Sequence, residues 1–151
     1  MVESREKPDM FMGEYNHTID AKGRLIVPAK FREQLGEAFV LTNGNDGCLN
    51  IYTIEDWESK MEQLQHLPNK EDTRKLIRKL VACANTVEVD KQGRILVPTA
   101  LREHAGLDKD VVLAGVIDKI EVWDKDRWEK VSSADDIDDI AERLADLGLS
   151  I

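Results

Sequence analysis

Two short segments each place an aspartate four residues before an arginine, with a glycine directly before that arginine. Asp20 and Arg24 stand in IDAKGRLIVP, and Asp90 and Arg94 stand in VDKQGRILVP. The guanidinium group of arginine is a planar fork of donors, which matches phosphate oxygens and the edge of guanine. The aspartate could hold that fork in one orientation. The alternative is an ion pair that only ties a turn together, and an exposed pair of this kind contributes little to stability.

The spacing in both segments is typical of a tight turn between two strands. Gly23 and Gly93 can adopt positive φ, and the carboxylates of Asp20 and Asp90 can accept hydrogen bonds from amide groups of the turn. These four residues are the predicted organisers of the two turns. The arginines of the turns and the cations around them are candidates for contacts with a polyanion: Arg24, Arg94, Lys22, Lys91, Arg32 and Arg102.

The two segments belong to a longer internal repeat of about 45 residues. Most matches occur at an offset of 70, and Trp57 pairs with Trp128 at an offset of 71. Each unit predicts a strand, a tight turn, a return strand, a short helix and a second hairpin. The short helices are expected from Pro28 to Gly36 and from Pro98 to Gly106, because proline suits a first helical turn and glycine a helix end.

These elements divide the chain into five expected segments. A unit this small buries too little apolar surface to be stable alone, so two units should pair, within one chain or between chains. The segments are a flexible N-terminus (1–12), a first unit (13–60), a helical connector (61–84), a second unit (85–130) and an acidic C-terminal helix (131–151).

Two segments outside the units have apolar side chains at helical spacing. In the connector, basic residues lie opposite the apolar stripe, and in the tail the opposite side is acidic. Both stripes are expected to pack in the core or against another subunit. The apolar positions are Leu76, Ile77, Leu80 and Val81 in the connector, and Ile137, Ile140, Leu144 and Leu147 in the tail.

The net charge of −9 argues at first against a nucleic-acid partner, but the charge is unevenly distributed. From Ser132 to Ile151, six acids stand against one arginine, a net of −5, so the rest of the chain carries only −4. A local basic surface is therefore compatible with this acidic chain.

Several other classes of function have little support. No apolar run reaches the ~18 residues of a membrane span and the first residues lack a secretory signal, so we expect a cytoplasmic protein without a membrane partner. Cys48 and Cys83 have no cysteine or histidine at ligand spacing, so no metal is expected. No catalytic histidine motif or phosphate-binding glycine loop occurs, so we expect no enzyme, cofactor or small-molecule substrate.

The segments DAKGRLIVPAKFRE and DKQGRILVPTALRE resemble the AbrB-type swapped-hairpin domain of bacterial transcription regulators. Two such domains in one chain resemble the MraZ family in particular, over Met10 to about Lys130. The resemblance implies an α+β fold, with two pseudo-repeated swapped-hairpin units forming a small β-barrel and with flanking and connecting helices.

The resemblance also implies a function. Members of this family bind double-stranded promoter DNA at short direct repeats, assemble into rings, and regulate the division and cell-wall gene cluster together with their own gene. It implies repression and association with the nucleoid. Arg24 and Arg94 would contact DNA, with Arg32 and Arg102 as further contacts. Glu33 and Glu103 depart from the basic residue common after these last two positions.

Two alternatives remain open at this point. The net charge and the two apolar stripes would also suit an oligomeric scaffold or interaction module that does not bind DNA. The DNA-binding half of a toxin–antitoxin pair shares the fold, but such chains usually carry one domain and a disordered tail.

Overall fold

A computed structural model describes residues 10–151, and β1 begins at Phe11. Residues 1–9 of the segment expected to be flexible lie outside this range.

Each unit contains the predicted succession of strands and helices. The first holds β1 (Phe11–Thr18), β2 (Arg24–Ile26), α1 (Ala29–Leu35), β3 (Ala38–Asn43), η2 (Asn45–Gly47), β4 (Leu49–Thr53) and α2 (Ile54–Gln65). The second holds β5 (Asn85–Glu88), β6 (Arg94–Leu96), α4 (Thr99–Ala105), β7 (Asp110–Ile117), β8 (Ile120–Asp124) and α5 (Lys125–Ser133). Between the units lies α3 (Glu71–Leu80), and α6 (Ile137–Leu144) and η3 (Ala145–Leu147) follow the second.

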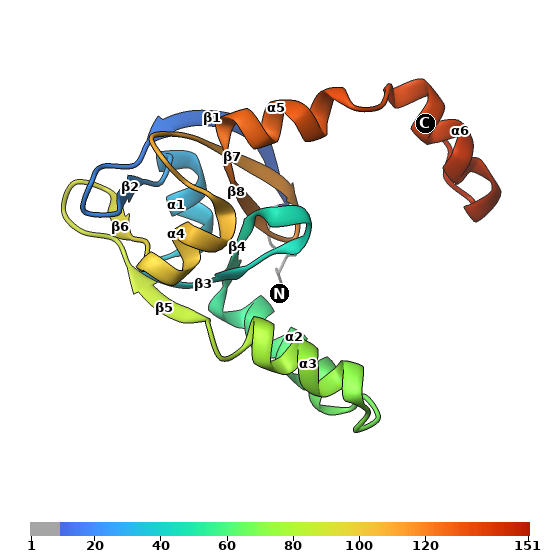
Figure 1. Cartoon of the computed structure of the whole chain (residues 1–151), viewed down its shortest axis with the longest axis horizontal. Helices are drawn as coiled ribbons and strands as arrows, with labels where there is room; N and C mark the ends of the chain where they lie inside the picture. Colours follow the sequence, from blue (N-terminus) through green and yellow to red (C-terminus); the bar gives the residue numbers. More distant parts are fainter. Residues whose placement is uncertain (1–9) are drawn as a thin grey trace, which may run out of the picture.

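The two units exchange strands within the one chain (Figure 1). A six-stranded antiparallel sheet has the order β1-β7-β8-β4-β3-β5, so the first strand of each unit pairs with the third strand of the other. The fourth strands, β4 and β8, pair at the centre. The short return strands β2 and β6 form a separate two-stranded ribbon. Of the two expected arrangements, the structure has pairing within one chain.

The mixed α+β class and the two repeated units are confirmed, but the expected small barrel is not closed. Among residues 10–151, β1 and β5 are the edges of the six-stranded sheet. The strands that would have to join these edges, β2 and β6, bond instead to each other. The end of β1 is linked to the ribbon by an isolated bridge between Ile19 and Leu25 and by a backbone bond from the Asp20 amide to the Arg24 carbonyl.

One apolar core holds both units together. Strand alternation turns Leu25 and Ile95 of the ribbon inward, where both are buried. Phe31 from α1 and Leu101 from α4 enter the same cluster, beside side chains of all the sheet strands. The ring of Tyr15 meets Phe31 edge-on at 5.0 Å between centroids, which fixes α1 against β1.

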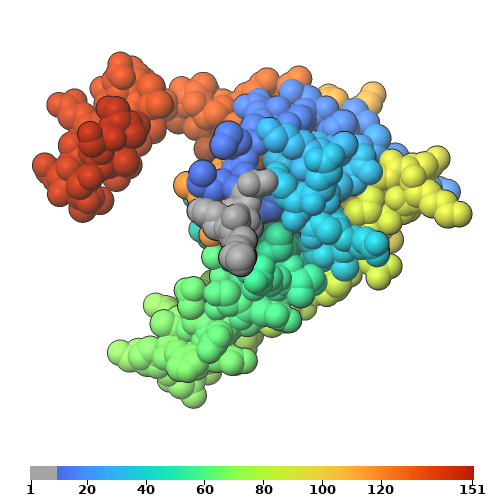
Figure 2. Space-filling model, turned by 180° about the vertical axis from the view of Figure 1, so that it is seen from behind, coloured from blue at the N-terminus to red at the C-terminus, as the bar shows by residue number. Residues whose placement is uncertain are grey.

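The remaining helices leave the body as two arms (Figures 1 and 2). One arm is formed by α2 and α3, and the other by α5 and α6. The repeated tryptophans attach the base of each arm to the sheet. The ring centroid of Trp57 lies 5.7 Å from that of Tyr52, and the ring centroid of Trp128 lies 5.8 Å from that of Trp123. Within residues 10–151, no helix has the length and apolar character that a membrane crossing requires.

Candidate nucleic-acid interface

The first turn is organised by Asp20 through both oxygens of its carboxylate. Oδ1 accepts hydrogen bonds from the amides of Lys22 at 3.0 Å and Arg24 at 2.9 Å. Oδ2 accepts a bond of 2.8 Å from Nε of Arg24. The backbone closes the turn with a bond from the Gly23 amide to the Asp20 carbonyl. Gly23 has φ +88°, as its predicted role requires.

The second turn repeats this arrangement almost atom for atom. Asp90 Oδ1 accepts from the amides of Gln92 and Arg94 at 2.9 Å, and Oδ2 accepts from Nε of Arg94 at 3.0 Å. Gly93 has φ +81°. The two turns differ in the position of their exposed lysine. Lys22 is the third residue of the first turn, and Lys91 is the second residue of the other.

The carboxylates hold each guanidinium by one edge only. Nε is the nitrogen bound in both pairs, and within residues 10–151 the terminal Nη atoms of Arg24 and Arg94 have no hydrogen-bond acceptor. The amide of Arg24 is the main cause that lowers the pKa of the Asp20 carboxyl, and the amide of Arg94 does the same for Asp90. Each turn therefore presents a fixed fork with its outer donors open, which can engage an anion in two places.

The structure brings the two arginines together, which their separation of 70 residues does not suggest. In the ribbon, Arg24 lies opposite Leu96, and Ile26 lies opposite Arg94. Arg24 and Arg94 are thus diagonal neighbours on one face, about 7–8 Å apart at that register. Both turns lie at the same end of the molecule, remote from the two arms (Figure 1).

Two apolar side chains share this outward face and were missed by the sequence prediction. Ile26 is 40% exposed and Leu96 is 59% exposed, although both belong to apolar runs. The signal was present, because alternation along RLIV and RILV puts these residues on the side of the arginines. The outward surface of the ribbon therefore consists of two arginines and two aliphatic side chains: Arg24, Ile26, Arg94 and Leu96. We name it the ribbon face.

Arg32 and Arg102 lie behind the ribbon face rather than on it. Nε of Arg32 donates to the Val27 carbonyl at 2.9 Å, and Nε of Arg102 donates to the Val97 carbonyl at 3.1 Å. Each guanidinium also lies against the turn of the other unit. A Cβ added to Gly93 would come within 2.9 Å of Cζ of Arg32. Each arginine therefore joins its own helix and strand to the opposite turn.

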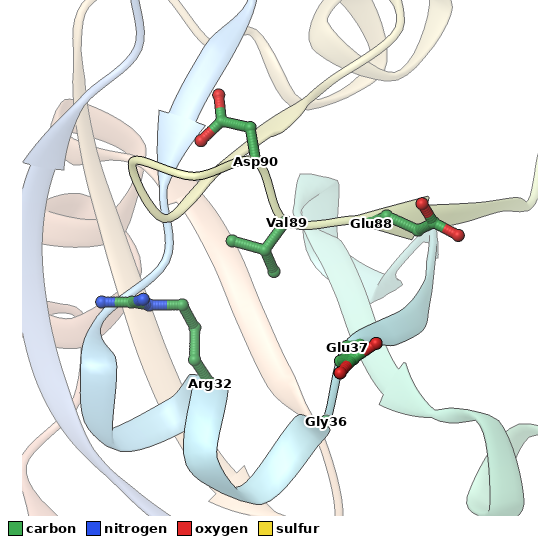
Figure 3. Close-up of a pocket in the computed structure, with 6 residues that line it drawn as sticks. All are labelled: Arg32, Gly36, Glu37, Glu88, Val89 and Asp90. Atoms are coloured by element: carbon green, nitrogen blue, oxygen red, sulfur yellow. The ribbon is translucent and has the colours of Figure 1, made fainter.

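A shallow pocket of about 450 Å³ lies between α1 and the second turn. Figure 3 shows Arg32 extending from α1 toward that turn, while the Asp90 carboxylate points away from Arg32. Glu37 and Glu88 line the other side of the pocket. The carboxylate of Asp90 is engaged by Arg94, and among residues 10–151 no acid forms an ion pair with Arg32.

The charge around the ribbon is positive despite the acidic chain. The six candidate cations and the two turn aspartates together sum to +4. Glu33 and Glu103, which follow the supporting arginines, are exposed and reduce that value. Each turn still places two cations beside one aspartate, which is a net charge of +1 for each turn.

Comparison with known proteins identifies the family of the chain. A family model described as "MraZ protein, putative antitoxin-like" matches it twice, over residues 10–79 and 80–147. The chain belongs to the MraZ family. The family resemblance predicted from the doubled Asp-x-x-Gly-Arg motif is thereby confirmed.

Individual MraZ relatives extend this result over nearly the whole length. A protein of Lachnoclostridium phytofermentans named "Transcriptional regulator MraZ" is 58% identical over 141 residues, covering 93% of this chain and 99% of that protein. Proteins of the same name from Ligilactobacillus salivarius and Clostridium tetani are 54% and 46% identical, each covering 93% of this chain and all of the relative. The MraZ relatives are thus named as regulators of transcription and not as enzymes.

Proposed function

We propose that this protein is a sequence-specific DNA-binding regulator of transcription that acts through the ribbon face. The observation that carries the proposal is the pair of guanidinium groups on adjacent strands, each held at Nε by its own aspartate. A two-stranded ribbon fits the major groove of B-DNA, and arginine is the side chain best suited to guanine and phosphate. Ile26 and Leu96 between the arginines would meet thymine methyl groups or sugars.

The six candidate cations have different parts in this proposal. Arg24 and Arg94 contact DNA directly, and the exposed Lys22 and Lys91 contact phosphates beside them. Arg32 and Arg102 act mainly as positioning residues, because their Nε atoms are bonded to backbone carbonyls beneath the turns. Their remaining donors can still add to the positive potential.

Binding through one ribbon should be weak, since few side chains reach the DNA. A ring of several copies would present ribbon faces at regular intervals, and short direct repeats along one duplex would engage several of them together. The second contact then gains from effective concentration. The proposed sites are repeats upstream of the division and cell-wall gene cluster that includes its own gene, where occupancy would repress transcription and place the protein on the nucleoid.

A binding titration against upstream DNA tests this function. Duplexes should carry all the direct repeats, one repeat, or scrambled repeats of the same composition, measured by mobility shift at two salt concentrations. We expect affinity to rise more than tenfold from one repeat to several, and to fall steeply with salt because phosphate contacts release counterions. Equal affinity for intact and scrambled repeats would contradict sequence specificity. No shift at all would favour a scaffold without DNA.

A further inference from the structure

Within residues 10–151, the tail helix α6 presents an apolar face that stands clear of the body. Ile137, Ile140 and Leu144 follow each other at helical spacing, and Ile140 and Leu144 are each 38% exposed. Leu147 in η3 continues the stripe and is 81% exposed. The opposite side is acidic, with Asp138, Asp139 and Glu142. Figures 1 and 2 show the helix standing clear of the sheet at the end of its arm.

The connector helix α3 is the complementary element on the other arm. Leu76 is 48% exposed and Ile77 is 38% exposed, beside a series of cations: Arg74, Lys75, Arg78 and Lys79. A groove of about 410 Å³ runs along it, which we name the α3 groove. Leu76, Leu80 and Tyr52 supply its apolar lining, and Lys79, His104 and Lys119 are among its polar residues.

The two helices both have an open apolar stripe, and their charges are complementary. Each is a short amphipathic helix with an open apolar stripe, and such stripes are normally covered by another helix. The polar residues are of opposite sign, acidic on α6 and basic along α3 and its groove. Complementary charges steer encounter and fix the register of an interface whose affinity comes from apolar burial.

The two helices of one copy are poorly placed to meet. Three residues separate α5 from α6, and they span at most about 11 Å. The Trp123–Trp128 contact fixes α5 to the body, and the two arms diverge in both views. A second copy has no such tether. A contact between two different surfaces also repeats from copy to copy, which closes into a ring when the rotation allows.

We infer that α6 of one copy docks its apolar face into the α3 groove of the next copy. This contact would build the oligomer that the proposed function requires. The inference rests on the proposed function only in expecting an oligomer. It also leaves the ribbon faces free, since the turns lie at the end of the molecule remote from both arms (Figure 1).

Two complementary variants test the contact without DNA. The tail variant carries Ile140→Asp and Leu144→Asp. The groove variant carries Leu76→Asp, at a residue that lines the α3 groove, and Ile77→Asp, at a residue that lies exposed on the helix beside it. Each variant should lose the wild-type oligomer, measured as mass by sedimentation or light scattering. Mixed in equal amounts, they should form a heterodimer, because the intact groove of one accepts the intact tail of the other. The control Met12→Asp with Val131→Asp changes exposed apolar residues elsewhere and should keep the wild-type mass.

Circular dichroism and thermal unfolding of each variant establish that the body remains folded. Retention of the wild-type mass by either variant would overturn the inference, and so would a fall in mass without a heterodimer in the mixture. A wild-type protein that is monomeric, with α6 covered by its own chain, would overturn it as well. Failure of the contact leaves DNA binding by the ribbon untouched, since DNA affinity is measured separately with arginine variants.

Discussion

At the scale of single residues, the aspartate, glycine and arginine of each Asp-x-x-Gly-Arg turn have different roles. The aspartate accepts two backbone amides and one guanidinium nitrogen, the glycine permits positive φ, and the arginine alone has donors left over. The arginine is therefore the member of the motif that folding does not fully explain. Its recurrence in both turns supports a role in binding.

The pH dependence of the turns follows from the lowered pKa of Asp20 and Asp90. A carboxyl with a lowered folded pKa contributes stability above its ordinary value of 3.8, and that contribution is lost as pH falls through the folded pKa. Asp20→Asn with Asp90→Asn should be less stable than wild type at pH 7. The difference should shrink at a pH well below 3.8, where the two carboxyl groups of the wild type become protonated. Urea unfolding at both pH values measures it, and a difference independent of pH would contradict the assigned contacts.

Glycine replacements separate backbone strain from steric contact. Gly36 and Gly23 have similar φ, +84° and +88°, but a Cβ at Gly36 meets nothing within 4 Å, whereas one at Gly23 lies 2.8 Å from the Val97 carbonyl. Gly36 has ψ −168°, a backbone region that is essentially open to glycine alone, so Gly36→Ala should cost about 1–3 kcal/mol from the backbone conformation. Gly23→Ala should cost clearly more, because that carbonyl is backbone. Gly93→Ala should lie between them, since the Arg32 side chain can move. Chemical denaturation gives the order, and equal costs would show that the turns do not pack as described.

At the scale of elements, the ribbon combines one strand from each unit, and its two faces have opposite duties. The inner face supplies Leu25 and Ile95 to the common core, and the outer face presents the arginines. Reciprocal bonds from Val27 to the Gly93 carbonyl, at 2.9 Å, and from Val97 to the Gly23 carbonyl, at 2.8 Å, extend the ribbon to both turns. Neither unit can form this surface alone.

Adjacent residues of β6 should therefore respond oppositely to replacement. Ile95→Ala removes buried side-chain volume and should cost about 2–5 kcal/mol of unfolding free energy. Leu96→Ala changes an exposed residue and should alter stability by about 0.5 kcal/mol or less, while weakening DNA binding through the ribbon face. Denaturation and DNA titration of both variants measure the contrast. A destabilising Leu96→Ala would contradict the orientation of the ribbon.

Local features of this fold were predictable, including the hairpins β3–β4 and β7–β8, and the pairing of strands between the two units was not. The turns, their aspartates and the short helices follow from glycine, proline and period-two alternation, which act over a few residues. The pairings between the units join residues far apart in the chain, such as Phe11 with Ile117 and Ala38 with Glu88, and no local pattern encodes such contacts. That is why the proximity of Arg24 to Arg94 came only from the structure. The positions of Arg32 and Arg102 also came only from the structure, because these side chains bond to backbone carbonyls and lie against the turn of the other unit.

At the scale of the whole molecule, the acidic tail and the two positive turns lie at opposite ends (Figure 1). The acidic residues of the tail lie on an arm remote from the positive turns (Figure 1). The net charge of −9 is therefore no obstacle to a local contact with DNA. Such an arrangement favours an assembly in which the arms meet each other and the ribbons face outward.

The most direct measurement compares Arg24→Ala with Arg94→Ala in one chain against the control Lys125→Ala with Lys130→Ala. Both double variants remove two exposed or half-exposed cations, but the control residues lie on α5. On duplexes with intact upstream repeats, the arginine variant should bind at least a hundredfold more weakly, and its salt dependence should flatten by about 0.9 for each phosphate that the protein no longer neutralises. The control should bind as wild type does, and the oligomer mass should be unchanged in both. Wild-type affinity of the arginine variant for those repeats would contradict DNA recognition through the ribbon face.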